Sequence, residues 1–243
     1  MATRCLQDRI ALVTGASRGI GRAVAVRYAK EGAKLILVAR TPGALEEVDD
    51  EIRAVSGTGA MLVPMDLKNG ELIDKLGLAL HERYGRLDIL VGNAAILGGL
   101  QPIHHYTPDA WNNIIEVNLN ANWRLIRSLD PLLRLSPAGR VLFVTSRTSE
   151  TMPAYWGPYT VSKSALESLV FSYAKELKRT NIKVNIIDPG IAATDMRAEA
   201  FPGENPETLV RPEDIAHFFV DPVMPANIKS GKKIFATKTK STS

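Results

Sequence analysis

The sequence predicts an α/β fold in which a doubly wound parallel sheet carries helices on both faces. Two observations predict it. Short apolar runs rich in Val, Ile and Leu alternate with longer helical stretches along the 243 residues, and a glycine-rich segment joins the first apolar run to the first helical stretch. That alternation is typical of βαβ units, whose parallel strands are buried between two layers of helices. We expect a single domain over residues 1–243.

Six runs have the length and composition of buried strands: Ile10–Thr14, Lys34–Ala39, Met61–Pro64, Leu87–Val91, Val141–Thr145 and Lys183–Ile187. Five stretches are expected to be helical: Ile20–Glu31, Gly43–Val55, Glu71–Tyr84, Asp109–Leu135 and Pro158–Arg179. Pro131 should kink or restart the fourth helix, because proline has no N–H to donate within a helix.

The C-terminal third carries weaker patterns. Prolines and a glycine interrupt Ala192–Arg211, which is expected to be a flexible substrate loop or short helix over a cleft, with a plain connector as the equal alternative. Ile234–Ala236 could add a last short strand before a polar tail at about 237–243.

Composition excludes several classes of protein. The net charge of +4 owes much to lysines near the C-terminus, but no aromatic interleaving or zinc spacing accompanies them, so we expect no nucleic-acid partner and no metal site. The single cysteine fits a reducing compartment. No run approaches the ~20 apolar residues of a membrane span, and no signal peptide precedes the first strand. We expect a soluble, cytoplasmic protein with no membrane partner.

The segment Thr14–Gly21 has the composition of a phosphate-binding turn. Glycines at 15, 19 and 21 allow a tight turn and a close approach of the backbone to a pyrophosphate. The following helix would offer the anion unpaired N–H groups. Its place between a strand and a helix makes the dinucleotide interpretation strong. We expect cofactor contacts from three further residues of this turn and its helix: Ser17, Arg18 and Ile20.

The end of the second strand indicates which dinucleotide is bound. An NAD-preferring fold carries an acid there to bind the ribose 2′-hydroxyl, whereas this chain reads Val38-Ala39-Arg40-Thr41. Arg40 can pair with a 2′-phosphate, and Arg18 could reach the same group. Two basic residues and no acid favour NADP.

Tyr159 and Lys163 lie four residues apart, thirteen residues after Ser146. On a helix, positions i and i+4 share one face. A neighbouring cation favours the ionised form of a phenol, so Lys163 should lower the pKa of Tyr159 toward neutrality and suit it to proton transfer. Ser149 or Thr148 could replace Ser146 as the hydroxyl donor, although the spacing to Tyr159 favours Ser146.

With these segments assembled, the chain resembles the short-chain dehydrogenase/reductase family, whose compact members have a Rossmann-like fold. The glycine turn, Ser146, Tyr159 and Lys163 match the family's motifs. Further matches, in the family's order, are Asp66-Leu67 for the adenine, Asn93-Ala94 beside the adenosine, Asn118 in a kinked helix, Asn185, Pro189-Gly190 along the nicotinamide, and Thr194 at its carboxamide. The C-terminus departs from the family's glycine-rich last strand, which puts the tetramer in doubt.

The resemblance implies hydride transfer between the nicotinamide of NADP and a carbonyl or secondary alcohol. Tyr159 would exchange the proton, Lys163 would also bind the nicotinamide ribose, Ser146 would bind the substrate oxygen, and Asn118 would link Lys163 to solvent through a water. A structural role for Asn118 is the equal alternative. A small-molecule substrate is expected, with a 3-oxoacyl thioester as the first guess, and a homo-oligomer, either dimer or tetramer.

Two other interpretations compete with this one. The first is a noncatalytic NADP-binding sensor or interaction protein on the same fold, since a fold does not guarantee an activity. The second is a sugar-nucleotide epimerase or dehydratase, but the chain leaves no room for the longer C-terminal substrate domain of those proteins.

Overall fold

The computed structural model describes residues 4–236. Its centre is a parallel sheet with the strand order β3-β2-β1-β4-β5-β6-β7. The strands are β1 Ile10–Thr14, β2 Lys34–Ala39, β3 Met61–Pro64, β4 Ile89–Gly92, β5 Arg140–Val144, β6 Lys183–Asp188 and β7 Lys233–Phe235. The order reverses between β1 and β4, as in a doubly wound sheet, and ligands bind such sheets outside the carboxyl ends of the strands at this switch point.

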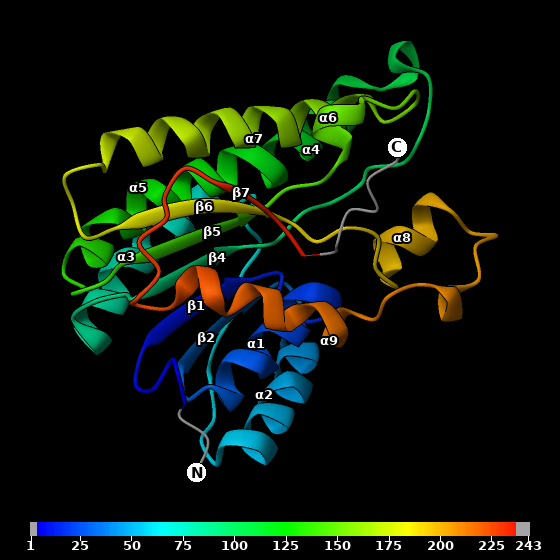
Figure 1. The fold of residues 1–243 in the computed structure, drawn as a ribbon. Helices are drawn as coiled ribbons and strands as arrows, with labels where there is room; N and C mark the ends of the chain where they lie inside the picture. The colour runs from blue at the N-terminus through cyan, green and yellow to red at the C-terminus, as the bar shows by residue number, and fades with distance from the viewer. Residues whose placement is uncertain (1–3, 237–243) are drawn as a thin grey trace, which may run out of the picture.

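Helices cover both faces of the sheet (Figure 1). The longer helices are α1 Gly19–Lys30, α2 Pro42–Ser56, α3 Gly70–Tyr84, α4 Pro108–Ile115, α5 Ala121–Arg134 and α7 Gly157–Glu176. The shorter ones are α6 Thr148–Thr151, α8 Asp195–Ala200 and α9 Pro212–Ile215, with single 3₁₀ turns at Ile103–His105, Pro206–Thr208, Ala216–Phe219 and Asp221–Val223. No helix within residues 4–236 has both the length and the apolar character to cross a lipid bilayer.

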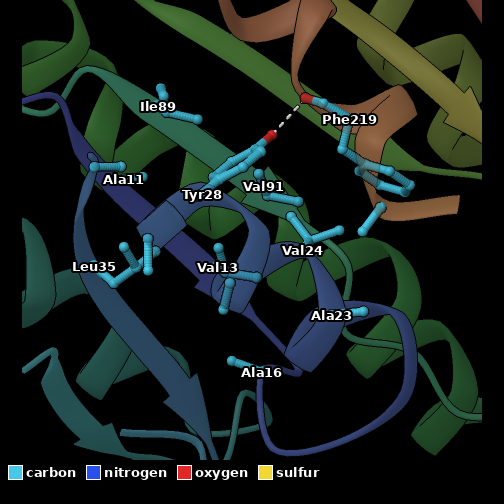
Figure 2. Packing of buried hydrophobic residues seen from close by; sticks show 14 of the residues in the cluster. Ala11, Val13, Ala16, Ala23, Val24, Tyr28, Leu35, Ile89, Val91 and Phe219 are labelled. Carbon is cyan, nitrogen blue, oxygen red and sulfur yellow. Dashed lines mark hydrogen bonds between the residues drawn. The ribbon is translucent and has the colours of Figure 1, made fainter. Parts of the chain in front are cut away.

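Two apolar clusters hold the layers together. One packs α1, α2 and the segment after α9 on the first face of the sheet, where Tyr28 is fully buried and donates a hydrogen bond to the Phe219 carbonyl at 2.7 Å (Figure 2). The other packs α3, α5 and α7 on the opposite face around Phe143. The central strands β1, β2, β4, β5 and β6 are largely apolar because both of their faces are buried.

The predicted strands agree with the structure to within two residues, but the prediction for Pro131 is wrong. The α5 helix runs through Pro131 to Arg134, because the proline lies on the exposed side of its last turn and removes only one backbone hydrogen bond there. The irregularity lies upstream instead, where Glu116–Asn120 forms one turn of π-helix between α4 and α5. Such turns are frequent at functional sites.

A polar cluster closes the end of the sheet opposite to the carboxyl ends of its strands. Buried Arg9 donates to the carbonyls of Asp88 at 3.0 Å and Ala138 at 2.5 Å. Buried Arg140 reaches the carbonyls of Pro225 at 2.7 Å and Asn181 at 3.1 Å. These bonds satisfy charges that burial would otherwise penalise, and they join distant loops at this end. The carboxyl ends of the strands remain available for a site.

Candidate active site

The glycine-rich turn has the backbone that only glycine adopts readily. Gly15 and Gly19 have φ angles of 64° and 55°, in the left-handed region. A Cβ at Gly21 would overlap the Gly15 carbonyl oxygen. The Asn93 side chain at the end of β4 donates to the Thr14 carbonyl at 2.9 Å. Asn93 therefore fixes the turn against the neighbouring strand.

The N-terminus of α1 has no side-chain cap in the described part of the chain. Arg18 is the residue that precedes the helix, and none of the described side chains accepts a hydrogen bond from the first turn. That turn also contains no acid. Unpaired N–H groups at a helix start are suited to a phosphate. Ser17 and Ile20, from which the sequence predicts cofactor contacts, lie half-buried at this turn.

Two cations lie around this turn, and their surroundings differ. Arg40 and Thr41 are exposed just after β2, next to Ala39 rather than an acid. Arg18 instead forms an ion pair with Asp195 at the start of α8, with Arg18 Nη1 2.9 Å from Asp195 Oδ2. Both side chains of that pair are 70% exposed, so an anionic ligand could compete for Arg18.

The residues predicted for the two ends of the dinucleotide lie on either side of the turn. Asp66 Oδ1 accepts from the Lys68 N–H at 3.0 Å, beside buried Leu67 and an open hollow. Thr194 lies on the other side, where its methyl group would be 3.4 Å from a Cβ on Gly19. Thr194 Oγ1 accepts from the Arg197 N–H at 3.2 Å and caps α8.

The remaining residues predicted from the family's motifs differ in where they lie. Ala94 N–H donates to Thr14 Oγ1 at 3.1 Å, next to Asn93. Pro189 is buried after β6 and Gly190 is exposed with a φ of 72°. Asn185, by contrast, lies inside β6 and bonds the Lys229 carbonyl at 2.9 Å, so it orders the segment before β7 and does not line the site.

Tyr159 and Lys163 lie on α7 and face the end of β5. Tyr159 is 7% exposed and Lys163 only 2%. Lys163 Nζ donates to the Val144 carbonyl at 2.8 Å and lies 5.8 Å from the centre of the Tyr159 ring. Ser146 follows β5, is half-buried, and accepts a bond from Thr148 Oγ1 at 3.1 Å. The carboxyl end of one strand and one helix face thus bring the predicted triad together.

The expected effect of Lys163 on Tyr159 is not found. Burial raises the pKa of Tyr159 to about 12, the Ser146 side chain lowers it in part, and the Asp188 charge adds to the rise. Burial also lowers the pKa of Lys163 to about 8. The ammonium is bound to a backbone carbonyl, and desolvation of the phenolate outweighs its attraction. Tyr159 therefore holds its proton at neutral pH.

Asn118 is fully buried in the π-helical turn and its polar groups are engaged. Its side-chain amide pairs with both backbone groups of Ile96, at 2.9 and 3.0 Å, and donates to Ser162 Oγ at 3.1 Å. The Asn122 side chain donates to its main-chain carbonyl at 2.8 Å. None of these bonds reaches Lys163. They fix the segment after β4 at Ile96 against α7, and the water link from Asn118 to Lys163 stays a prediction.

The segment before α7 is strained and aromatic. Met152 and Tyr155 have φ angles of 45° and 73°, which are unfavourable for bulky side chains and recur at functional sites. The Trp156 ring lies 5.7 Å from the Tyr159 ring and 6.0 Å from that of Phe201, between α8 and the start of the 3₁₀ turn at Pro206–Thr208. Trp156 therefore connects the catalytic helix with the 192–211 segment.

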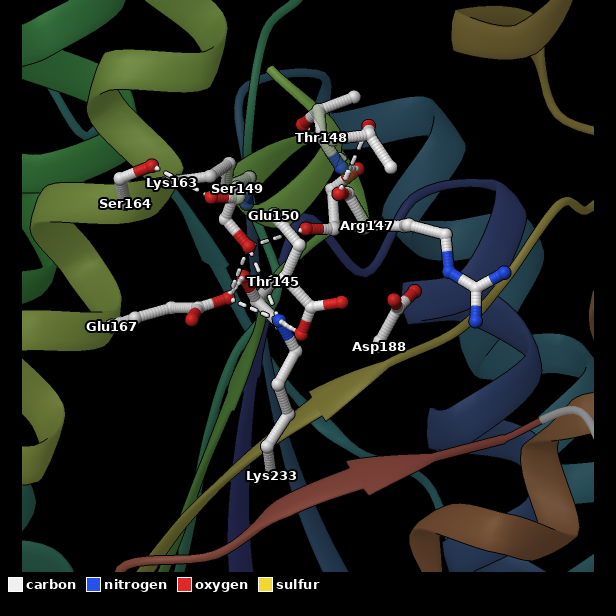
Figure 3. A network of polar contacts seen from close by, with 12 residues as sticks. Thr145, Arg147, Thr148, Ser149, Glu150, Lys163, Ser164, Glu167, Asp188 and Lys233 are labelled. Carbon is white, nitrogen blue, oxygen red and sulfur yellow. Dashed lines mark hydrogen bonds and ion pairs between the residues drawn. The ribbon is translucent and has the colours of Figure 1, made fainter. Parts of the chain in front are cut away.

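Four polar residues bind one another around the triad: Thr145, Glu167 and Lys233, which the sequence did not indicate, and Ser149, which was expected only as an alternative to Ser146. Their bonds to one another (Figure 3) surround the turn that carries Ser146. The spacing of Glu167 from Lys163, again four residues, was the one available signal for them. No three His, Cys, Asp or Glu side chains within the described range 4–236 form a group that could hold a metal ion.

Comparison with known proteins identifies the family. The short chain dehydrogenase family model matches residues 9–205. The uncharacterized oxidoreductase YciK of Escherichia coli K12 is 38% identical over 217 residues, which are 88% of this chain and 86% of YciK. The chain therefore belongs to the short-chain dehydrogenase/reductase family of oxidoreductases, as predicted from its motifs.

Solved structures agree with this assignment. A short chain dehydrogenase from Shigella flexneri 2a, complexed with NADP, superposes with a TM-score of 0.93 at 36% identity, over 96% of this chain and 99% of that one. A short chain dehydrogenase from Escherichia coli CFT073, complexed with NADPH, gives the same TM-score and identity over 98% of this chain and all of that one, 100%. The predicted fold is confirmed.

Proposed function

We propose that this protein is an NADP(H)-dependent oxidoreductase that reduces a carbonyl compound, or oxidises the corresponding secondary alcohol, with Tyr159 as the proton donor or acceptor. The observation that carries the proposal is the convergence of Ser146, Tyr159 and Lys163 at the end of β5, next to the glycine-rich turn. Reduction of a C=O group needs a hydride donor and an acid side by side. The glycine-rich turn would bind the cofactor that donates the hydride, and Tyr159 would be the acid.

The described residues fit NADP. The uncapped start of α1 suits the pyrophosphate, and the left-handed glycines allow the backbone to approach it. Exposed Arg40 suits a 2′-phosphate, since no acid follows β2. The NADP and NADPH complexes of the two similar dehydrogenases support the same choice. The nicotinamide would supply or accept the hydride.

The roles of the side chains follow from their surroundings. Tyr159 retains its proton at neutral pH, since its pKa is raised to about 12 chiefly by burial, so it can protonate an oxygen that gains charge during reduction. The Lys163 ammonium, 5.8 Å from the ring, would stabilise the phenolate that remains. Ser146 would donate a hydrogen bond to the same substrate oxygen. Asn118 would hold the segment at Ile96 against α7 and, through a water, would link Lys163 to solvent.

The side chains around this centre favour an apolar substrate. Six large apolar residues are exposed in the segments around residue 103, before α7 at 152–155, and at 191–210: Ile103, Met152, Tyr155, Ile191, Phe201 and Val210. The nearest cation of α8, Arg197, is already paired with Glu204 through two hydrogen bonds of 2.5 and 2.7 Å. An apolar ketone or the acyl chain of a 3-oxoacyl thioester suits such a surface, and the thioester is the first substrate to test.

We also propose a cytoplasmic homodimer formed through α5 and α7. Trp123 on α5 is 45% exposed, with the guanidinium carbons of Arg124 and Arg127 within 6 Å of its ring centre, at 5.7 and 5.9 Å. Val161 on α7 is exposed as well. Sedimentation of wild type and Trp123→Asp would test the proposal: the variant should be a monomer, and an unchanged dimer would contradict it.

The enzymatic proposal is tested by NADPH oxidation with a panel of ketones, quinones and 3-oxoacyl thioesters. Tyr159→Phe should bind NADPH normally and lose about 10²–10⁴-fold in kcat, the usual contribution of a general acid. Tyr155→Phe is the matched control, since this phenol is exposed nearby, and should keep kcat. A wild-type protein that binds NADPH but reduces nothing in a Tyr159-dependent way would instead be a noncatalytic NADP-binding protein.

A further inference from the structure

Glu167 extends the catalytic face of α7 by one more turn. It lies four residues after Lys163 and eight after Tyr159, so the three side chains follow one another along the helix. Its Oε1 atom accepts hydrogen bonds from three side chains: Thr145 Oγ1 at 2.5 Å, Ser149 Oγ at 2.6 Å and Lys233 Nζ at 2.9 Å (Figure 3). Three donors on one carboxylate oxygen make a strongly held, charge-assisted site.

Two of these donors flank Ser146. Thr145 is the residue before it, and the Ser149 N–H donates to the Ser146 carbonyl at 3.1 Å to close the following turn. The Ser149 hydroxyl lies 2.8 Å from that carbonyl and 2.6 Å from Glu167. Its single hydrogen serves one acceptor at a time, and the charged carboxylate is the stronger one. Glu167 thereby holds both ends of the short segment that presents Ser146.

Lys233 brings the last strand of the sheet into this site. Its side chain is only 13% exposed and pairs with Glu150 at 2.6 Å as well as with Glu167. Burial acts to lower the pKa of Lys233, but the bonds to Glu150 and Glu167 outweigh it and raise the pKa. Burial acts to raise the pKa of Glu167, and bonds from Ser149, Thr145 and Lys233 reverse that. The pair is therefore charged at neutral pH.

The Glu167 carboxylate also acts on Lys163. Burial lowers the pKa of Lys163 to about 8, and the Glu167 charge opposes that change. The other titratable or charged groups around this face come from four elements: Tyr159 on α7, Asp188 at the end of β6, Arg147 and Glu150 at α6, and Lys233 on β7. Burial raises the pKa of Asp188. Glu167 is thus the anion whose attraction helps Lys163 to keep its proton.

We propose that Glu167, which binds Thr145 and Ser149 and pairs with Lys233 of β7, is a positioning residue for the reaction, because it fixes the turn that carries Ser146 and supports the charge of Lys163. This inference rests on the proposed function of the same site. It adds that a lysine of the last strand contacts this positioning residue.

The test compares the pH profiles of kcat/KM for two variants. The alkaline limb falls where Lys163 loses its proton. In Glu167→Gln the supporting anion is gone, so the limb should move to lower pH by about half a unit or more, with kcat reduced about tenfold. In Lys233→Met a repelling cation is gone while the Glu167 carboxylate remains, so the limb should stay or move to higher pH. Glu176→Gln, an exposed position on the same helix, should match wild type.

NADPH binding, followed by its fluorescence, should stay within about twofold of wild type in all three variants and reports that they are folded. If Glu167→Gln and Lys233→Met both lost activity but neither shifted the alkaline limb, the network would have only a structural role. That result would overturn the inference. Normal kcat and an unmoved limb in Glu167→Gln would do the same. If Glu167→Gln does not fold, a Lys233→Met limb at lower pH than wild type overturns it. Failure of the proposed function looks different: Tyr159→Phe would then keep full activity.

Discussion

The charged groups in two regions of the molecule differ in their exposure to solvent. On the catalytic face of α7 they are buried, whereas around the glycine-rich turn and the 192–211 segment they are exposed. On α7, Lys163 is 2% exposed and its ammonium is bound to a carbonyl of β5. Beside the turn, Arg18 and Asp195 are each 70% exposed in their ion pair. Buried polar contacts are costly to break, whereas exposed ion pairs contribute about 0–1 kcal/mol. The chemistry is therefore held rigidly, and the parts that meet cofactor and substrate can rearrange.

The largest effect is expected from removing the buried charge of Lys163. Lys163→Met should lower kcat/KM by about 10²–10⁴-fold, yet leave the free energy of unfolding at pH 7 unchanged or higher. Burial lowers the pKa of Lys163 from 10.5 to about 8, so below pH 8 its charge costs the folded state about 3 kcal/mol. Chemical denaturation and steady-state kinetics measure the two effects.

The sign of this cost also gives a pH dependence. Between pH 8 and 10.5 the unfolded chain keeps the proton that folded Lys163 has lost, so this residue's contribution to wild-type stability rises with pH, and the Met variant should lack that rise. Lys175→Met, an exposed change on the same helix, is the control and should alter neither property. A large loss of stability in Lys163→Met would contradict this account.

The next effect concerns the exposed cation after β2. Arg40→Asp should weaken NADPH binding by about 10- to 100-fold, the value of a charge-assisted hydrogen bond or two, and should leave NADH binding nearly unchanged. Fluorescence titration with both cofactors gives the ratio. Equal losses for the two cofactors would show that Arg40 does not bind the 2′-phosphate.

Trp156 joins the two regions and should give an intermediate result. Trp156→Ala removes ring contacts to both Tyr159 and Phe201, which are each worth about 0.5–1.5 kcal/mol. We expect KM for an apolar ketone to rise about 2- to 10-fold and kcat to fall less. If kcat fell as far as in Tyr159→Phe, Trp156 would belong to the rigid catalytic face instead of the variable one.

The smallest effect should come from the exposed pair. Asp195→Asn should change the free energy of unfolding by less than about 0.5 kcal/mol and should tighten NADPH binding by about twofold, because Arg18 is then free for the cofactor. Titration at low and high salt checks this, since added salt should erase the difference. Weaker NADPH binding in the variant would show that the pair supports the cofactor site.

The sequence predicts most of what depends on local patterns. Buried parallel strands are continuous apolar runs, so β1 to β6 are visible from composition, and the glycine turn and the Tyr159–Lys163 spacing follow from backbone geometry. The degree of burial cannot be predicted from such patterns. The sequence therefore predicts a lowered pKa for Tyr159, whereas burial raises it. Pro131 was misjudged because the cost of a helical proline depends on where in the helix it lies.

Long-range partners are the other limit. Glu167 and Lys233 are 66 residues apart, and neither has a pattern that indicates the other. The 192–211 segment is expected to be a loop or short helix, and it holds the short helix α8 and a bridge between Ala192 and Val210. Their short lengths leave no periodic signal, so their positions could not be predicted from the sequence. Whether it closes over substrate stays a prediction.

The contact of Lys233 with α7 also has a meaning for the newly made chain. During synthesis, N-terminal segments emerge and begin to fold first, so the glycine-rich turn and its neighbouring strands can form while β7 is still to come. Ser149 must wait for a partner 84 positions later in the chain. In a growing polypeptide the glycine-rich turn can therefore form before the turn bearing Ser146 gains its contact with β7.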